Sequence, residues 1–337
     1  MTNRQIQLKR RPVGRPVDAD FEMVAGKLPP VPAGAVLRRT IYLSLDPYMR
    51  GRMSDAASYA TPVALGGVMT GGTVSQVIES GNPAFKPGDF VVGNDGWQEY
   101  GASDGRELRK VDPSDAPIST GVGVLGMPGM TAYVGLLDIG QPKPGETVVV
   151  SAASGAVGSV VGQIAKIHGC RAVGVAGAPE KCDYVVRELG FDACVSHHDP
   201  NLFEALREQC PKGIDVYFEN VGGKVAAAVF RLLNKGARIP LCGLISDYNA
   251  TEVVPGPPMR PLLVSRALVK GFIVSDHADR AAAFLRDGSA WVREGRIKYK
   301  EDIVEGLDQA PAALLRLFDG ANFGKLLVRV SKDPTRG

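Results

Sequence analysis

The segment at residues 148–166, V-V-V-S-A-A-S-G-A-V-G-S-V-V-G-Q-I-A-K, carries the clearest chemical signal in the sequence. An apolar strand pattern runs into Ala153-Ser154-Gly155-Ala156-Val157-Gly158, and a helical pattern follows. The spacing is that of the dinucleotide fingerprint G-x-G-x-x-G, with Ala153 in place of the first glycine. Gly155 lets the backbone approach a pyrophosphate, Gly158 permits close helix–strand packing, and the helix N-terminus attracts phosphate. A tight turn that binds nothing is the alternative.

The second strand of this pattern ends at Val175-Ala176-Gly177-Ala178, which contains no carboxylate. Sites for NAD usually carry an acidic residue there, to bind the ribose hydroxyls. Lys181 follows closely, and a cation without an acid favours NADP(H), because a carboxylate would repel the 2′-phosphate. The alternative has Glu180 as the ribose ligand and Lys181 as a solvated residue of the first helical turn.

Two patterns of secondary structure surround this loop. The first 126 residues predict short strands that suit a small barrel, as in residues 35–45 and 68–78, where apolar and polar residues alternate. Pro87-Gly88 predicts a type II turn with positive φ at the glycine. From residue 128 strands alternate with helices, which predicts an α/β fold with a doubly wound parallel sheet. The strands expected there are 147–151, 172–175, 193–195, 214–218, 237–242 and 268–274, with helices over 158–168 and 179–189.

The C-terminal residues return to another pattern. Apolar residues at helical spacing predict a helix over 302–319, which Gly320 ends in the left-handed conformation, and a strand over 325–330. We therefore expect three segments: a catalytic domain at 1–126, a dinucleotide-binding domain at 127–295, and a return to the catalytic domain at 296–337.

Composition excludes several classes of protein. A net charge of +3 over 337 residues gives no reason to expect nucleic acid or an anionic membrane as a partner. The sequence lacks a run of about 18 apolar residues and a secretory signal pattern. The five cysteines are odd in number and form no C-x-x-C pair, so we expect a reduced, cytoplasmic protein. Neither Cys nor His precedes His168, which excludes a catalytic zinc held by the first half of the chain.

Six ordered motifs resemble one known family. They are S-L-D-P-Y-M-R-G-R-M (44–53), M-P-G-M-T-A-Y (127–133), A-A-S-G-A-V-G (152–158), E-N-V-G-G (219–223), C-G-L-I-S-D-Y-N (242–249) and N-F-G-K (322–325). Together they resemble the zinc-independent medium-chain dehydrogenases/reductases of the prostaglandin reductase/leukotriene B4 dehydrogenase group, which includes alkenal double-bond reductases and curcumin reductase. The resemblance implies a Rossmann domain inserted in a GroES-like barrel, a homodimer, and metal-free, NADPH-dependent reduction of a carbon–carbon double bond conjugated to a carbonyl.

The resemblance also implies roles for individual residues. Gly155, Ala156, Val157 and Gly158 would hold the pyrophosphate, and Lys181 the 2′-phosphate. His197 stands where the family often has a tyrosine near that phosphate, while its neighbour His198 is better explained as an exposed loop residue. Asn220 would lie near the nicotinamide ribose. The remaining cofactor-lining residues would be Cys242, Gly243, Leu244, Ile245, Ser246, Tyr248, Phe272, Ile273, Val274 and Asn322.

Tyr248 is the residue we expect to take part in catalysis. Hydride addition to the β-carbon of an enone places negative charge on the carbonyl oxygen, and a phenol that is protonated at neutral pH stabilises it. Tyr48 would form a wall of the substrate site for a small hydrophobic α,β-unsaturated carbonyl compound. The alternatives are that Tyr248 only packs in its loop and that Tyr48 packs at the barrel rim.

Other functions on the same scaffold remain open. They are quinone reduction, dehydrogenation of an alcohol, and NADPH binding without catalysis. The strand expected at 268–274 would lie at an exposed edge of the sheet, which favours pairing with a second copy of the chain.

Overall fold

The structure is a computed structural model, and it describes residues 2–336. The chain divides into two compact units. Unit 1 comprises Met1–Gly123, Glu301–Asn322 and Leu326–Gly337, and unit 2 comprises Val124–Lys300 and Phe323–Lys325. The sequence assigned all of 296–337 to the first domain, whereas residues 296–300 and 323–325 group with unit 2. The reason is backbone pairing, because Gly324 bridges to Gly155 and the Lys325 N–H donates to the Lys300 carbonyl at 2.8 Å.

Unit 2 contains a six-stranded parallel sheet in the order β10-β9-β8-β11-β12-β13. Its strands are β8 (Thr147–Ser151), β9 (Arg171–Ala176), β10 (Ala193–Ser196), β11 (Ile214–Phe218), β12 (Leu233–Leu241) and β13 (Leu268–Gly271). The helices are α2 (Met127–Val134), α3 (Gly158–Ile167), α4 (Pro179–Arg187), α5 (Leu202–Gln209), α6 (Gly223–Phe230), α7 (Arg260–Ser265) and α8 (Ala281–Arg293). A π-helix spans Gly135–Gly140 and a 3₁₀-helix Val274–Arg280.

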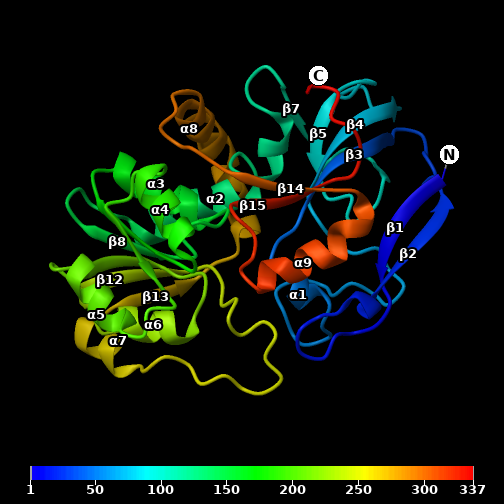
Figure 1. Cartoon of the computed structure of the whole chain (residues 1–337). Helices are drawn as coiled ribbons and strands as arrows, with labels where there is room; N and C mark the ends of the chain where they lie inside the picture. The colour runs from blue at the N-terminus through cyan, green and yellow to red at the C-terminus, as the bar shows by residue number, and fades with distance from the viewer. Residues whose placement is uncertain (1, 337) are drawn as a thin grey trace. The chain divides into compact units, whose positions relative to one another are not determined.

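Helices cover both faces of this sheet. Figure 1 shows α3 and α4 on one face and α5, α6 and α7 on the other. The strand β8 is buried along its whole length, as its run of β-branched residues predicts for the centre of a parallel sheet. The doubly wound fold expected from the sequence is therefore confirmed.

Unit 1 is built on a second, largely antiparallel sheet in the order β14-β15-β3-β4-β5-β7, in which β6 also pairs with β3. The strands β1 and β2 form a separate antiparallel pair. The strands are β1 (Thr2–Leu8), β2 (Phe21–Lys27), β3 (Val36–Ser44), β4 (Thr73–Ser80), β5 (Phe90–Gly93), β6 (Tyr100–Ser103), β7 (Arg109–Val111), β14 (Glu301–Glu305) and β15 (Lys325–Arg329). The helices are α1 (Met49–Arg52) and α9 (Ala310–Phe318), with 3₁₀ turns at Asp18–Asp20, Ile118–Val122 and Leu307–Gln309.

The prediction of a helix over 302–319 is wrong for the first half of that range. Residues Glu301–Glu305 form β14, and the α-helix begins only at Ala310. Gly306 has φ 90°, which ends the strand and cannot continue a helix. β14 pairs with β15, and an ion pair between Arg329 and Glu305 at 2.7 Å also joins the two strands. Strand pairing therefore outweighs the local helical pattern. The positive φ expected at Gly88 and Gly320 is confirmed, at 94° and 64°.

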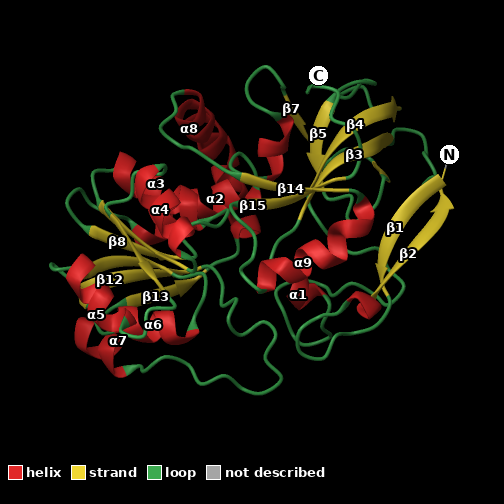
Figure 2. Cartoon of the chain, viewed as in Figure 1, coloured by secondary structure: helices red, strands yellow, loops and turns green. Residues whose placement is uncertain are grey.

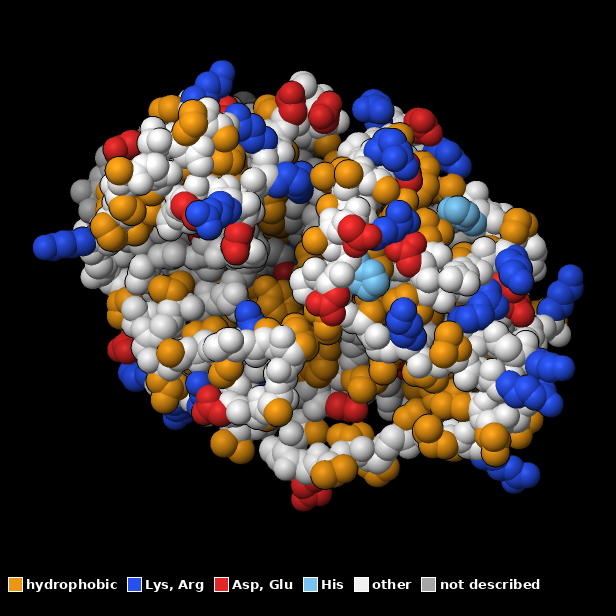
Figure 3. Space-filling view, turned by 180° about the vertical axis from the view of Figure 1, so that it is seen from behind, with side chains coloured by type: hydrophobic (Ala, Val, Ile, Leu, Met, Phe, Trp, Pro, Cys, Tyr) orange, Lys and Arg blue, Asp and Glu red, His pale blue; other side chains and the backbone are white. Residues whose placement is uncertain are grey.

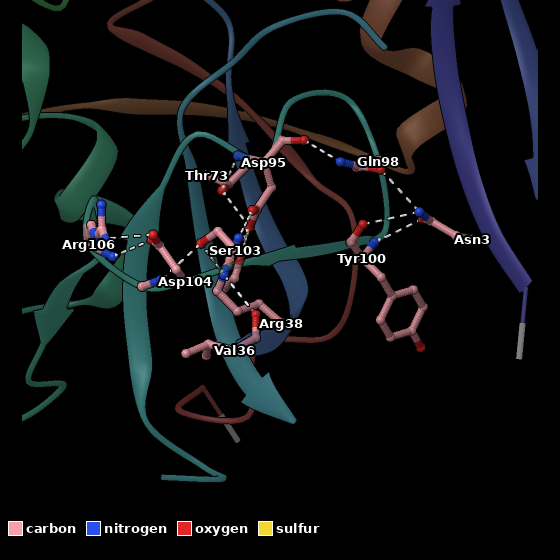
Figure 4. A network of polar contacts seen from close by, with 12 residues as sticks. Asn3, Val36, Arg38, Thr73, Asp95, Gln98, Tyr100, Ser103, Asp104 and Arg106 are labelled. Carbon is pink, nitrogen blue, oxygen red and sulfur yellow. Dashed lines mark hydrogen bonds and ion pairs between the residues drawn. The ribbon is translucent and has the colours of Figure 1, made fainter. Parts of the chain in front are cut away.

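An ion pair lies inside unit 1 (Figure 4). The guanidinium of Arg38 contacts the carboxylate of Asp95, and both side chains are 3% exposed. Thr73 and Ser75 donate hydroxyl hydrogen bonds to Asp95 at 3.2 and 3.0 Å. The charge is therefore both paired and hydrogen-bonded, which is the condition under which burial of an ion pair is tolerated.

Charged side chains of both signs are mixed over the face drawn in Figure 3. No helix among residues 2–336 is long and apolar enough to span a membrane. Within the same residues, no group of three or more His, Cys, Asp or Glu side chains is placed to hold a metal ion.

Candidate functional site

The carboxyl ends of the parallel strands in unit 2 form the candidate site. Numbered by their order along the chain, the strands are arranged 3-2-1-4-5-6, with β8 as the first and β11 as the fourth. The chain leaves β8 toward one side of the sheet and later crosses to β11 on the other side. In open α/β sheets a ligand binds at this switch point, outside the carboxyl ends of the strands.

The phosphate loop joins β8 to α3 as the sequence predicts. Ala152 adopts φ 52° and accepts a hydrogen bond from the Gly155 N–H at 2.9 Å, which forms the tight turn. A Cβ on Gly158 would collide with the Ala152 carbonyl, so the close helix–strand packing requires glycine there. No side chain caps the N-terminus of α3. An uncapped helix N-terminus at the carboxyl edge of a parallel sheet is a place where an anionic group can bind.

A group of cations lies beyond the end of β9. A Cβ on Gly177 would lie 3.1 Å from Nε2 of His197, which places that imidazole beside the turn between β9 and α4. Burial is the main cause that lowers the pKa of His197, and the positive charges of His198, Lys224 and Lys181 lower this pKa further. Glu180, the acidic alternative for the ribose, is exposed. The two lysines, without an acid between them, fit a 2′-phosphate on the adenosine ribose, and the neutral imidazole of His197 can donate a hydrogen bond to it.

A buried carboxylate organises the loop after β11. Glu219 is 2% exposed, and its Oε1 accepts hydrogen bonds from the N–H groups of Val221 and Gly222 at 2.7 and 3.0 Å. The Ser151 hydroxyl, at the end of β8, donates to the same oxygen at 3.0 Å. Burial raises the pKa of Glu219, against the lowering effect of these hydrogen bonds. The carboxylate thus connects the ends of two neighbouring strands.

Asn220 is held by the same residues. Its backbone N–H donates to the Ser151 hydroxyl and its side-chain amide donates to the Ser151 carbonyl, both at 2.8 Å. Its own carbonyl accepts from the Ile245 N–H at 3.2 Å. The structure therefore brings Asn220 and the start of the loop after β12 together at the carboxyl edge.

Tyr248 lies in the long loop that joins β12 to α7, drawn without helix or strand in Figure 2. The Leu244 N–H donates to its hydroxyl oxygen at 3.4 Å. Gly243 has no side chain, which leaves space for this hydroxyl, because a Cβ there would lie 2.9 Å from it. Ser246 donates to the Val221 carbonyl at 2.6 Å, and this bond ties the loop to the one after β11.

Some expected site residues do not present their side chains at this edge. Phe272 is buried and its ring packs against that of Phe218 at 6.2 Å, so only its backbone is left to meet a carboxamide. Ile273 and Val274 continue from it with half-buried side chains. Burial raises the pKa of the Cys242 thiol to about 12, so this thiol stays protonated at neutral pH.

Two expected site residues belong to unit 1. Tyr48 directly precedes α1 and packs against the apolar core of that unit. Burial raises the pKa of its phenol well above the usual range, and the nearby Asp46 carboxylate adds to the effect. Asn322 follows α9 and is half-buried. Their roles toward the cofactor and substrate stay predictions.

Sequence reasoning missed three residues of the site. Ser151 and Glu219 form the hydrogen-bonded connection between β8 and β11, and Lys224 contributes to the cation group. The signal for Lys224 was present, since a lysine directly follows the glycine pair of E-N-V-G-G at the start of a helix. No local pattern links Ser151 to Glu219, because they lie 68 residues apart.

The fold and this edge define a dinucleotide-binding oxidoreductase. The family model described as "N-terminal domain of oxidoreductase" matches residues 4–111, and the one described as "Zinc-binding dehydrogenase" matches residues 156–286.

Individual relatives cover almost the whole chain. The NADPH-dependent curcumin reductase of Escherichia coli (strain K12) is 53% identical, over 98% of this chain and 98% of that protein. The NADP(+)-dependent 2-alkenal reductase of Nicotiana tabacum is 43% identical, over 99% of each. The crystal structure of CurA from Vibrio vulnificus in complex with NADPH has a TM-score of 0.94 and 51% identity, covering 98% of this chain and 100% of that one.

The chain belongs to the zinc-independent medium-chain dehydrogenase/reductase family that contains these reductases. Its cofactor is NADP(H), which agrees with the phosphate loop and with the cations beyond β9.

Proposed function

We propose that the protein reduces the carbon–carbon double bond of α,β-unsaturated aldehydes and ketones with NADPH. The observation that carries the proposal is the position of a phenol, Tyr248, on the loop that Ser246 ties to the Asn220–Gly222 loop. The names of the relatives support it, since one is a curcumin reductase and another a 2-alkenal reductase. A protein that only binds the nucleotide would not need a phenol there.

The residues of unit 2 would hold the cofactor in three places. The N–H groups at Gly155 to Gly158 would bind the pyrophosphate, and Lys181, His197 and Lys224 the 2′-phosphate. Asn220 and the residues from Cys242 to Ser246 would line the nicotinamide end. When bound, NADPH supplies the hydride that the β-carbon of the substrate accepts.

Tyr248 would then stabilise the substrate's developing charge. The enolate oxygen becomes negative as the β-carbon is reduced, and a hydrogen-bond donor aimed at that oxygen lowers the barrier. A phenol hydroxyl both accepts and donates hydrogen bonds, so the bond from the Leu244 N–H to the Tyr248 oxygen is compatible with this role. Solvent would protonate the α-carbon afterwards.

The first experiment is NADPH oxidation with a panel of 2-alkenals and enones, with the products analysed by mass spectrometry. We expect the saturated aldehyde or ketone as product, with much slower oxidation of NADH. A simple quinone and a saturated aldehyde serve as matched acceptors without the conjugated enal. Faster turnover of the quinone, an allylic alcohol as product, or no turnover of any acceptor would contradict the proposal.

We also propose that the protein forms a homodimer through the edge of this sheet. All residues of β13 are exposed, and so are Leu263 and Val264 of α7 beside it. An unpaired edge strand next to apolar side chains suits antiparallel pairing with a second copy. Light scattering should give twice the chain mass, and Val269→Lys should halve it. A monomeric wild-type protein would contradict the proposal.

A further inference from the structure

Two cysteine sulfurs lie in contact on unit 2, between the helix α4 and the edge strand β10. Cys182 belongs to α4 and Cys194 to β10, 12 residues later, and their Sγ atoms are 2.7 Å apart. Both are free thiols and both are half-buried. An S–S bond is about 2.0 Å long, so only a small approach separates this contact from a disulfide.

The local packing explains why the two thiols meet. Cys194 is paired with Gly174 of β9 in the parallel register, and the glycine leaves space above the sheet. A Cβ on Gly174 would lie 3.4 Å from the Cys194 sulfur and 3.0 Å from Cγ1 of Val185. The helix α4 therefore packs closely over β9, which carries its Cys182 toward the neighbouring strand.

The two thiols are not equivalent. Cys194 donates its S–H to the sulfur of Cys182, and this hydrogen bond lowers the pKa of Cys182. Burial opposes the effect, and a hydrogen bond from the Ala176 backbone supports it. The same contact, together with burial, raises the pKa of Cys194. Cys182 is thus the thiol that ionises first and attacks an oxidant, since the thiolate is the nucleophile.

Cys170 and Cys210 lie in more buried surroundings than this pair. Cys170 donates to the Lys143 carbonyl at 3.2 Å, and burial raises the pKa values of Cys170 and Cys210 to about 11. Both of these side chains are buried. They are therefore better protected from oxidation and serve as internal controls for the half-buried pair, Cys182 and Cys194.

We propose that Cys182 and Cys194 are a redox-modification site, which forms a reversible disulfide when the protein meets hydrogen peroxide. The Cys182 thiolate attacks one peroxide oxygen, the O–O bond breaks, and a sulfenic acid and hydroxide result. The Cys194 thiol then attacks the Cys182 sulfur and displaces the sulfenic oxygen, which takes up a proton and leaves as water, while the hydroxide takes up the other proton. In total two thiols lose two electrons and two protons, and one peroxide becomes two waters.

The bond would tie α4 to β10, close to the residues expected to bind the 2′-phosphate. Lys181 precedes one cysteine, and His197 follows the other by three residues. The cross-link removes freedom from the unfolded chain, so we expect the oxidised protein to unfold at a higher temperature than the reduced one.

The test starts from the fully reduced full-length protein. After a mild excess of hydrogen peroxide, the thiol titre should fall by two from the five of the reduced protein. The intact mass should decrease by two hydrogens, and a proteolytic digest should contain one cross-linked peptide joining Cys182 to Cys194. Dithiothreitol should reverse all three changes. Peptide mapping needs no variant, so the result does not depend on the folding of a mutant.

Variants separate this pair from general oxidation. Cys182→Ser and Cys194→Ser should each abolish the cross-linked peptide and the rise in unfolding temperature, whereas Cys210→Ala should retain both. Three results would overturn the proposal: no loss of thiols, a disulfide between other cysteines, or gain of oxygen on Cys182 without a cross-link.

Discussion

Each unit of the protein contains a buried carboxylate, and the two carboxylates differ in the groups that surround them. In unit 1, Asp95 faces the guanidinium of Arg38 and two hydroxyl groups. In unit 2, Glu219 receives two backbone N–H groups and one hydroxyl, all on Oε1. The buried phenol of Tyr217 also lies beside this carboxylate and helps to lower the pKa of Glu219. The first charge is neutralised by a cation, and the second is held by neutral dipoles alone.

The comparison separates a structural role from a positioning role. A paired and hydrogen-bonded charge holds strands together and leaves nothing to bind a ligand. A carboxylate without a cation, at the carboxyl edge of a parallel sheet, fixes the loop that carries Asn220 at a cost in stability. We therefore expect changes at Asp95 to affect folding and changes around Glu219 to affect the site.

The largest effect should follow Asp95→Ala. Removing one partner of a buried pair leaves Arg38 charged and unmatched, which costs about 3–5 kcal/mol of stability. Urea unfolding followed by circular dichroism measures it. The control is Asp104→Ala, because the pair of Asp104 with Arg106 is exposed and its loss should cost less than about 1 kcal/mol. Equal losses for both variants would remove the distinction between the two kinds of site.

Tyr248→Phe should act on turnover instead of folding. We expect kcat to fall by about 10- to 1000-fold, since the donor to the enolate oxygen is lost, while the Kd for NADPH stays nearly the same. Stopped-flow absorbance and fluorescence titration measure the two quantities. Tyr59→Phe, an exposed tyrosine of unit 1, is the matched control. Unchanged turnover in Tyr248→Phe would exclude this phenol from the mechanism.

Lys181→Ala should change the choice of cofactor. Loss of one charge-assisted contact to the 2′-phosphate should weaken NADPH binding by about 10- to 100-fold and leave NADH binding nearly unchanged. Calorimetric titration with both nucleotides is the measurement. The exposed Lys235 of the same unit provides the matched control, Lys235→Ala. An equal loss for both nucleotides would show that Lys181 does not contact the 2′-phosphate.

The smallest expected effect is on the pH dependence of stability, and it tests the comparison of the two carboxylates most directly. Because burial raises the pKa of Glu219 in the folded protein, folding favours the protonated carboxyl group. Its ionisation at neutral pH therefore costs stability, and the cost disappears as pH falls through the folded pKa and then the unfolded one. Wild type should gain stability relative to Glu219→Gln between pH 7 and pH 4, by about 1 kcal/mol for each unit of the pKa shift.

Unfolding midpoints of the two proteins across this pH range provide the measurement, and Glu219→Gln itself controls for the titration of all other groups. A difference that is constant with pH would mean that Glu219 does not titrate as a buried, unpaired acid. NADPH binding measured on the same variant should weaken, since the loop that carries Asn220 loses one strong acceptor.

Much of unit 2 could be predicted from the sequence because its signals are local. The strand Thr147–Ser151, the phosphate loop and the start of α3 follow from apolar runs and glycine spacing within 20 residues. The strand Glu301–Glu305 was missed for the opposite reason, because its apolar residues also suit a helix and only pairing with β15 selects the strand. Local periodicity does not report the partner of an edge strand.

The sequence by itself determined the class of fold, the position of the glycine-rich loop between β8 and α3, and the lack of an acid at the end of β9. These features depend on residues close together along the chain. Only the tertiary structure joined Ser151 to Glu219, brought Lys224 toward His197 and set the thiol of Cys182 against that of Cys194. Those contacts arise where separate strands and helices end side by side in a parallel sheet. Their energies depend on burial and on distances between atoms, and neither can be obtained from the spacing of residues along the sequence.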